Sequence, residues 1–77
     1  MHKIYSKKQD LYLIIFNAKS LNGVVAVEND SGLYNLKFNF NHEGFLFLMN
    51  FTLEQANKVL DWIDINNTEN RVLVIDN

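Results

Sequence analysis

The sequence predicts an α+β domain: an antiparallel β-sheet of about five strands, in the order ββββαβ, with one helix over about residues 52–66 packed on one face. Three observations support this prediction. Apolar runs of strand length alternate with clusters of Asn, Asp, Ser and Gly. A single segment repeats apolar residues at the helical period. The chain has 77 residues, 21% of them charged, which is typical of one small folded domain spanning residues 1–77.

The segment from residue 33 to residue 51 predicts a hairpin with an aromatic face. Alternate side chains of a strand share a face, and a four-residue loop over 41–44 opposes two alternating sets of large side chains. The expected pairs are Phe40 with Phe45, Phe38 with Phe47, Leu36 with Met49, and Tyr34 with Phe51. Opposed apolar pairs of this kind stabilise an antiparallel ladder. We therefore expect this face to pack on the helix, and Phe47→Ala to cost ~3–5 kcal/mol as a core truncation.

Residues 52–66 carry the helical pattern. Thr52 and Gln55 have the spacing of a capping box, in which each side chain bonds the backbone amide of the other residue. One face of the helix is apolar and consists of Leu53, Ala56, Val59, Leu60 and Ile63. The opposite side carries the carboxylates of Glu54, Asp61 and Asp64. We expect the helix to end near Asn66, because Asn tolerates a left-handed exit.

Three further apolar runs complete the predicted sheet: 11–16, 24–27 and 71–76. A turn over 29–32 would pair Val27 with Tyr34 and Val25 with Leu36. A right-handed crossover through the helix lets the last strand return beside the first. We therefore expect the spatial order 5-1-2-3-4, and residues 1–9 to form a flexible basic arm.

This arrangement leaves one sheet face only partly covered. Leu46 and Leu48 would lie on the face away from the helix, with Lys37 among the residues beside them. An exposed apolar patch of this kind marks an interface, and the chain has no Cys with which to stabilise a small core by disulfides. We expect a homodimer that joins these faces, and Leu46→Lys with Leu48→Lys to dissociate it.

Catalysis is not expected. His42 and Glu43 are neighbours in a loop, no third group is implied beside them, and too few ligands are present for a metal site. The three Gly residues are far apart in the sequence and each is expected in a separate turn, so no phosphate-binding loop is predicted. The sequence therefore predicts no enzyme activity and no cofactor.

Charge and composition narrow the remaining function classes. A formal net charge of −2 argues against generic nucleic-acid binding, although the arm, with Lys3, Lys7 and Lys8, provides that alternative. Aromatic residues on a sheet can also stack bases, but here they are expected to face the helix. No run is long enough to span a membrane, which favours the cytoplasm. The abundance of Asn, Ile, Phe and Lys indicates a low-G+C source, such as a bacterium or phage.

The function most consistent with these features is a small protein-binding module. It would act as a phage or mobile-element inhibitor that occludes a host defence protein, by analogy of size and charge alone. Trp anchors interfaces, and carboxylates steer basic partners. The expected contact residues are Trp62, Glu54, Asp61, Asp64, Leu46, Leu48 and Lys37. The alternatives are a nucleic-acid-binding protein that uses the basic arm, and an enzyme or ligand-binding barrel completed by dimerisation.

Overall fold

The computed structural model describes residues 1–67 and 69–76, and it has the predicted α+β class. In chain order the elements are β1 (His2–Ser6), β2 (Leu11–Phe16), the 3₁₀ turn η1 (Ala18–Ser20), β3 (Leu21–Glu28), β4 (Tyr34–Phe40), β5 (Gly44–Phe51), α1 (Leu53–Trp62) and β6 (Arg71–Ile75). The described strands form two sheets where one was expected. Sheet A has the order β2-β1-β6, and sheet B has the order β3-β4-β5.

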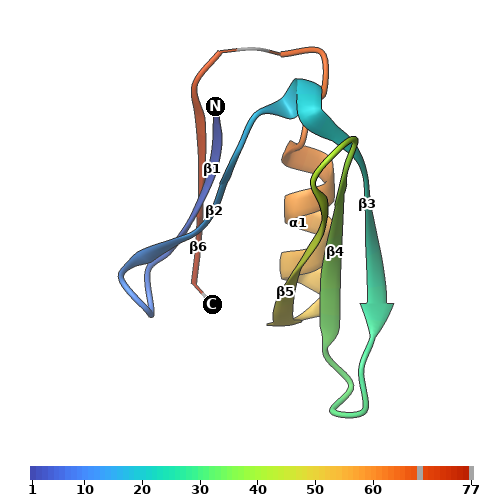
Figure 1. The fold of residues 1–77 in the computed structure, drawn as a ribbon. Helices are drawn as coiled ribbons and strands as arrows, with labels where there is room; N and C mark the ends of the chain where they lie inside the picture. Colours follow the sequence, from blue (N-terminus) through green and yellow to red (C-terminus); the bar gives the residue numbers. More distant parts are fainter. Residues whose placement is uncertain (68, 77) are drawn as a thin grey trace.

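The two sheets stand side by side and enclose the core between them (Figure 1). Helix α1 contacts β4 and β5 of sheet B and β6 of sheet A, so it joins the two sheets. The fully buried side chains come from both sheets and from the helix, and include Ile4, Leu36, Phe38, Phe51 and Val59. Each sheet therefore has one inner face in the core and one outer face in solvent.

The first nine residues, expected as a flexible arm, contain the central strand of sheet A. Strand β1 pairs antiparallel with β2 and parallel with β6. Its side chains alternate, with His2, Ile4 and Ser6 buried. The predicted order 5-1-2-3-4 is wrong in two places. Strand β1 lies between β6 and β2, which were expected to pair with each other, and β2 does not pair with β3.

The predicted register of the β4–β5 hairpin is wrong by one residue over most of its length. Phe40 pairs with Gly44 across a three-residue turn, and Gly44 has a φ of +83°, which suits glycine. Phe38 therefore pairs with Leu46, and Lys37 with Phe47. A slip of one residue moves every side chain to the other face. Phe45, Phe47 and Met49 consequently point outward, and Leu48 enters the core.

A bulge then restores the predicted end of the hairpin, where Tyr34 pairs with Phe51. Asn50 has a φ of 67°, a conformation that Asn tolerates better than most residues. The Asn35 side-chain oxygen accepts hydrogen bonds from the Asn50 amide, at 3.2 Å, and from the Asn29 side chain, at 3.0 Å. Asn29 also donates to the Asn50 side chain at 3.0 Å. Three asparagines from three segments thus hold the extra residue in place.

The β3–β4 pairing is also displaced by one residue from the prediction. Val27 pairs with Asn35 and Val25 with Lys37. Val25 and Val27 therefore lie on the outer face of sheet B, and Val24 and Ala26 pack against the core.

Helix α1 begins as predicted, with both hydrogen bonds of the Thr52–Gln55 capping box present. It ends at Trp62, four residues before the predicted end. Ile63 is extended, and the Asp64 side chain accepts a hydrogen bond from the Asn66 amide at 3.0 Å. A local turn of this kind competes with helical hydrogen bonds. Leu53, expected on the buried side of the helix, is 55% exposed.

Candidate protein-binding surface

The outer face of sheet B is a grid of nine positions, three from each strand. Strand β3 contributes Gly23, Val25 and Val27, β4 contributes Asn39, Lys37 and Asn35, and β5 contributes Phe45, Phe47 and Met49. Opposed residues of neighbouring strands share a face. Met49 has no opposed partner, because the register shifts beside it, and it shares this face by its alternation with Phe45 and Phe47 along β5. We call these nine residues the grid. Its two outer columns are apolar or bear no side chain, and its central column is polar.

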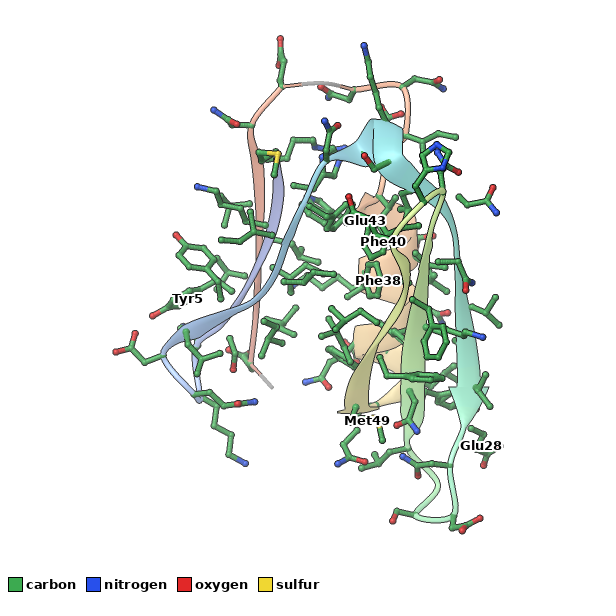
Figure 2. The ribbon with its side chains drawn as sticks, in the orientation of Figure 1. Tyr5, Glu28, Phe38, Phe40, Glu43 and Met49 are labelled. Carbon is green, nitrogen blue, oxygen red and sulfur yellow. The ribbon has the colours of Figure 1, made fainter. Side chains whose placement is uncertain are left out.

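The large apolar side chains of the grid are exposed to solvent by about half. The exposed fractions are 59% for Phe45, 43% for Phe47, 55% for Met49, 51% for Val25 and 49% for Val27. Scattered exposed apolar residues are normal on protein surfaces, but a contiguous set marks a site of interaction. Figure 2 shows the reason for their exposure: Phe38 and Phe40 of β4 point toward the interior, so the alternate residues of this sheet face away from it.

Lys37 lies at the centre of the grid. Its ammonium is 4.5 Å from the centroid of the Phe45 ring and 5.9 Å from that of Phe47. The two rings meet edge to face, with centroids 5.5 Å apart. A cation over an aromatic face is attracted by the ring quadrupole. These contacts favour a position of the ammonium over the phenylalanine rings, which places the charge within the apolar surface.

The outer face of sheet A repeats part of this pattern. Lys3 of the central strand pairs with Ile15 on one side and Val72 on the other. Here, however, Tyr5 donates a hydrogen bond to Asp10 and its ring packs on Tyr12, with centroids 5.2 Å apart. Tyr5 points away from the core in Figure 2. Ile15, Val72 and Val74 are about half-exposed on this face. Its aromatic residues are tyrosines with polar hydroxyl groups, whereas those of the grid are phenylalanines, so the grid is the more apolar surface and the stronger candidate.

The residues expected to contact a partner do not form one site. Lys37 is central to the grid, but Leu48 is only 8% exposed and belongs to the core, and Leu46 is 42% exposed on the inner side of β5. The carboxylates Glu54, Asp61 and Asp64 are exposed on and just after the helix. The Trp62 ring is half-buried against His2, with centroids 5.0 Å apart, and beneath the Arg71 guanidinium. It covers the edge of the core.

Five grid residues were expected on the face toward the helix and lie on the outer face instead: Val25, Val27, Phe45, Phe47 and Met49. The signal that could have found them is the polar alternation Asn35, Lys37 and Asn39 in β4. Three polar residues at a period of two define the solvent face of the central strand. A three-residue turn ending in Gly44 then places Phe45 and Phe47 beside them.

A buried histidine lies elsewhere, at the start of sheet A. His2 is 1% exposed, and among the described residues its Nε2 atom has no hydrogen-bond partner. Its ring packs on Phe16, with centroids 5.4 Å apart, as well as on Trp62. Burial lowers the pKa of His2 below its ordinary value, and the Arg71 guanidinium and the N-terminal ammonium lower this pKa further. Asp64 opposes this shift.

The lowered pKa predicts that acid destabilises the fold through His2. The unfolded chain binds this proton near the ordinary pKa of 6.5, whereas the folded chain binds it only at lower pH. The stabilising contribution of the neutral His2 side chain is therefore fully present above pH 6.5. It is lost as the pH falls from 6.5 toward the pKa of His2 in the folded chain. Urea unfolding at pH 7.5 and pH 5.5 should show the loss, and His2→Leu should reduce it. His42→Gln is the matched control, because His42 is exposed in the β4–β5 turn; a variant of His2 that kept the full dependence would contradict the assignment.

An open cleft of about 400 Å³ separates β2 from β5. Its walls include Ile14 and Phe16 of sheet A. On the other side they include Phe40, Glu43 and Phe45 of the β4–β5 hairpin. The lining is mainly apolar, with one carboxylate. Among residues 1–67 and 69–76, no group of three or more His, Asp or Glu side chains is placed to hold a metal ion.

Within the described chain, no helix has the length and apolar character needed to cross a bilayer. Comparison with protein-family models, with curated proteins and with solved structures gave no match. The surface chemistry of the grid is therefore the basis for assigning a function.

Proposed function

We propose that this chain is a small, non-enzymatic protein-binding module, and that the grid on the outer face of sheet B is its contact surface. The supporting observation is the contiguous set of five half-exposed apolar side chains around one lysine. Interfaces are enriched in aromatic residues and Met at their centres. The grid offers apolar contact and one ammonium group, which suits recognition of a surface.

The energetics favour covering this face. Burying a large apolar side chain contributes ~1.5–3 kcal/mol relative to leaving it in water. Phe45, Phe47 and Met49 lie in a single row along β5, where one partner surface can cover them together.

The test compares two matched variants in capture experiments from a lysate of a low-G+C bacterium. Phe47→Asp places a charge in the grid, and Val72→Asp places one on the outer face of sheet A. We expect a protein retained by the wild type and by Val72→Asp to be lost with Phe47→Asp. Circular dichroism of both variants confirms folding. Equal retention by all three proteins would contradict the assignment of the surface.

A role in blocking a host defence protein, in a phage or mobile element and in the cytoplasm, stays a prediction from composition. The homodimer is the alternative occupant of the surface. Its form through Leu46 and Leu48 is wrong, because Leu48 is in the core. A second copy seated on the grid would appear as a dimer in sedimentation at micromolar concentration, and Phe47→Asp would dissociate it.

Single-stranded nucleic acid is the second candidate ligand, favoured by one observation. Phe45 and Phe47 are exposed on a sheet face, where aromatic rings can stack bases. The basic residues expected to bind phosphates are not in a flexible arm: Lys3 is in strand β1, and Lys7 and Lys8 lie in the turn that follows it. The grid itself has one cation. Fluorescence anisotropy with a labelled 12-nucleotide RNA at 0.15 M salt tests this candidate, and submicromolar binding lost in Phe47→Asp would support it over a protein partner.

A further inference from the structure

We infer that the partner of the grid presents a carboxylate to Lys37 within an apolar contact, and that it is an acidic segment of another protein. This inference rests on the proposed function and names the chemistry of the partner. The kind of ligand it describes is a segment in which Asp or Glu is flanked by aromatic or aliphatic side chains.

The position of the charge is the first step. Lys37 pairs with Val25 on one side and with Phe47 on the other, and it is the only charged residue among the nine of the grid. Any partner that covers the apolar columns on both sides of β4 must also cover the lysine between them. The charge therefore cannot be left at the rim, where solvent would screen it.

The second step is the present environment of the ammonium. Its contacts among the described residues are with the Phe45 and Phe47 rings. These rings attract the cation, but they do not replace the water that a partner would displace. Burying an unpaired charge is costly, whereas pairing it with a carboxylate offsets that cost and leaves the apolar contacts to stabilise the complex. The partner surface must supply that carboxylate.

A second copy of this chain meets the requirement poorly. A two-fold axis through the middle of the grid brings the two Lys37 side chains together, because both faces of such an interface are identical. Like charges placed opposite each other oppose association. The acidic residues of sheet B are at its ends: Figure 2 shows Glu28 at one end and Glu43 at the other. Shifting the axis to pair Lys37 with either of them would leave much of the grid uncovered.

Nucleic acid also carries negative charge, but its phosphates recur along the strand and call for several cations. The grid supplies one. In addition, the Lys37 ammonium lies over the Phe45 ring, where a stacked base would have to lie. A single carboxylate within an apolar segment fits this surface better.

The test is a selection from a displayed library of random 12-residue peptides against four immobilised proteins: wild type, Lys37→Glu, Lys37→Met and Phe47→Asp. Lys37→Met keeps the long apolar stem and removes the charge. We expect wild type to enrich peptides with Asp or Glu beside aromatic or aliphatic residues, and Lys37→Glu to enrich Lys or Arg at the same place. Synthetic peptides from the wild-type selection should bind Lys37→Met ~10-fold more weakly, and Lys37→Glu more weakly still, a loss typical of a close charge pair.

The remaining outcomes would each contradict one part of this inference: the carboxylate, the binding surface or the kind of partner. Peptides that depend on Phe47 but carry no acidic residue, or that bind Lys37→Met as tightly as wild type, overturn the carboxylate and leave the binding surface intact. Absence of any peptide that depends on Phe47 overturns the proposed function itself. A concentration-dependent dimer dissociated by Phe47→Asp assigns the grid to a second copy. Tight binding of the 12-nucleotide RNA that is lost in Lys37→Glu assigns it to nucleic acid.

Discussion

Leu48→Ala is expected to lower the free energy of unfolding by ~2–5 kcal/mol, the range for truncating a buried leucine. Phe47→Ala, one residue earlier, is expected to lower it by less than about 1 kcal/mol, as for a surface site. Leu48 is 8% exposed and part of the core cluster, whereas Phe47 is 43% exposed on the outer face of sheet B. Urea unfolding of the two variants and the wild type measures both values.

This pair of substitutions distinguishes the two registers of the β4–β5 hairpin. A four-residue loop would bury Phe47 and expose Leu48, so the order of the two effects would be reversed. The three-residue turn that ends at Gly44 requires the order given above. The urea slope should be unchanged in both variants, because a changed slope would mean that the denatured or native ensemble had altered.

The sequence was sufficient for the elements of sheet B and for the helix start. The alternation in 33–51 and the capping box of Thr52 and Gln55 are local patterns, and the structure has both. The predicted register of the β4–β5 hairpin was wrong because residues 45–49 are Phe-Leu-Phe-Leu-Met and are therefore apolar on both faces. Sequence specifies register strongly where one face must be buried and the other must not, because a one-residue slip then exchanges the two faces. Strand β4 has a polar face, formed by Asn35, Lys37 and Asn39. The prediction correctly turned this face to solvent, but it assigned the wrong residues of β5 as its neighbours.

In sheet A the apolar runs of β2 and β6 were predicted as strands, but the central strand β1 was not. Strand β1 has buried His2 and Ser6 where a core strand usually has apolar side chains. Its parallel neighbour β6 begins at Arg71, 69 residues after His2, and the pairing of such distant segments leaves no periodic signal. The split into two sheets arises because β2 and β3, expected as neighbours, do not pair and are instead edge strands of different sheets.

The error in the β4–β5 register also explains why the candidate surface was predicted only in part. A leftover apolar face with Lys37 on it was expected, and Lys37 is in fact at its centre. The neighbours assigned to it, Leu46 and Leu48, are replaced by Phe45, Phe47 and Met49 through the one-residue slip. The aromatic face that was expected to be core is thus divided: Phe38 is buried, and Phe45 and Phe47 are exposed.

Ile4→Ala is expected to destabilise the protein by ~2–5 kcal/mol, although Ile4 lies in the segment that the sequence allowed as a flexible arm. Its side chain is fully buried in the central strand of sheet A, where it pairs with Ile14 on one side and Leu73 on the other. For a domain of this size each kcal/mol lowers the Tm by roughly 4–8 °C. Thermal unfolding should therefore show a drop of about 10 °C or more.

Lys8→Ala is the matched control, because Lys8 is exposed in the turn after β1 and its loss should leave the Tm nearly unchanged. Deleting residues 1–6 is the stronger form of the experiment. Without β1 the open edges of β2 and β6 have no partner strand, and Phe16 and Leu73 lose the core contacts that β1 provides. We expect the shortened chain to be unfolded by circular dichroism. A truncated protein that kept the wild-type Tm would mean that this segment is an arm after all, and that sheet A is not part of the stable fold.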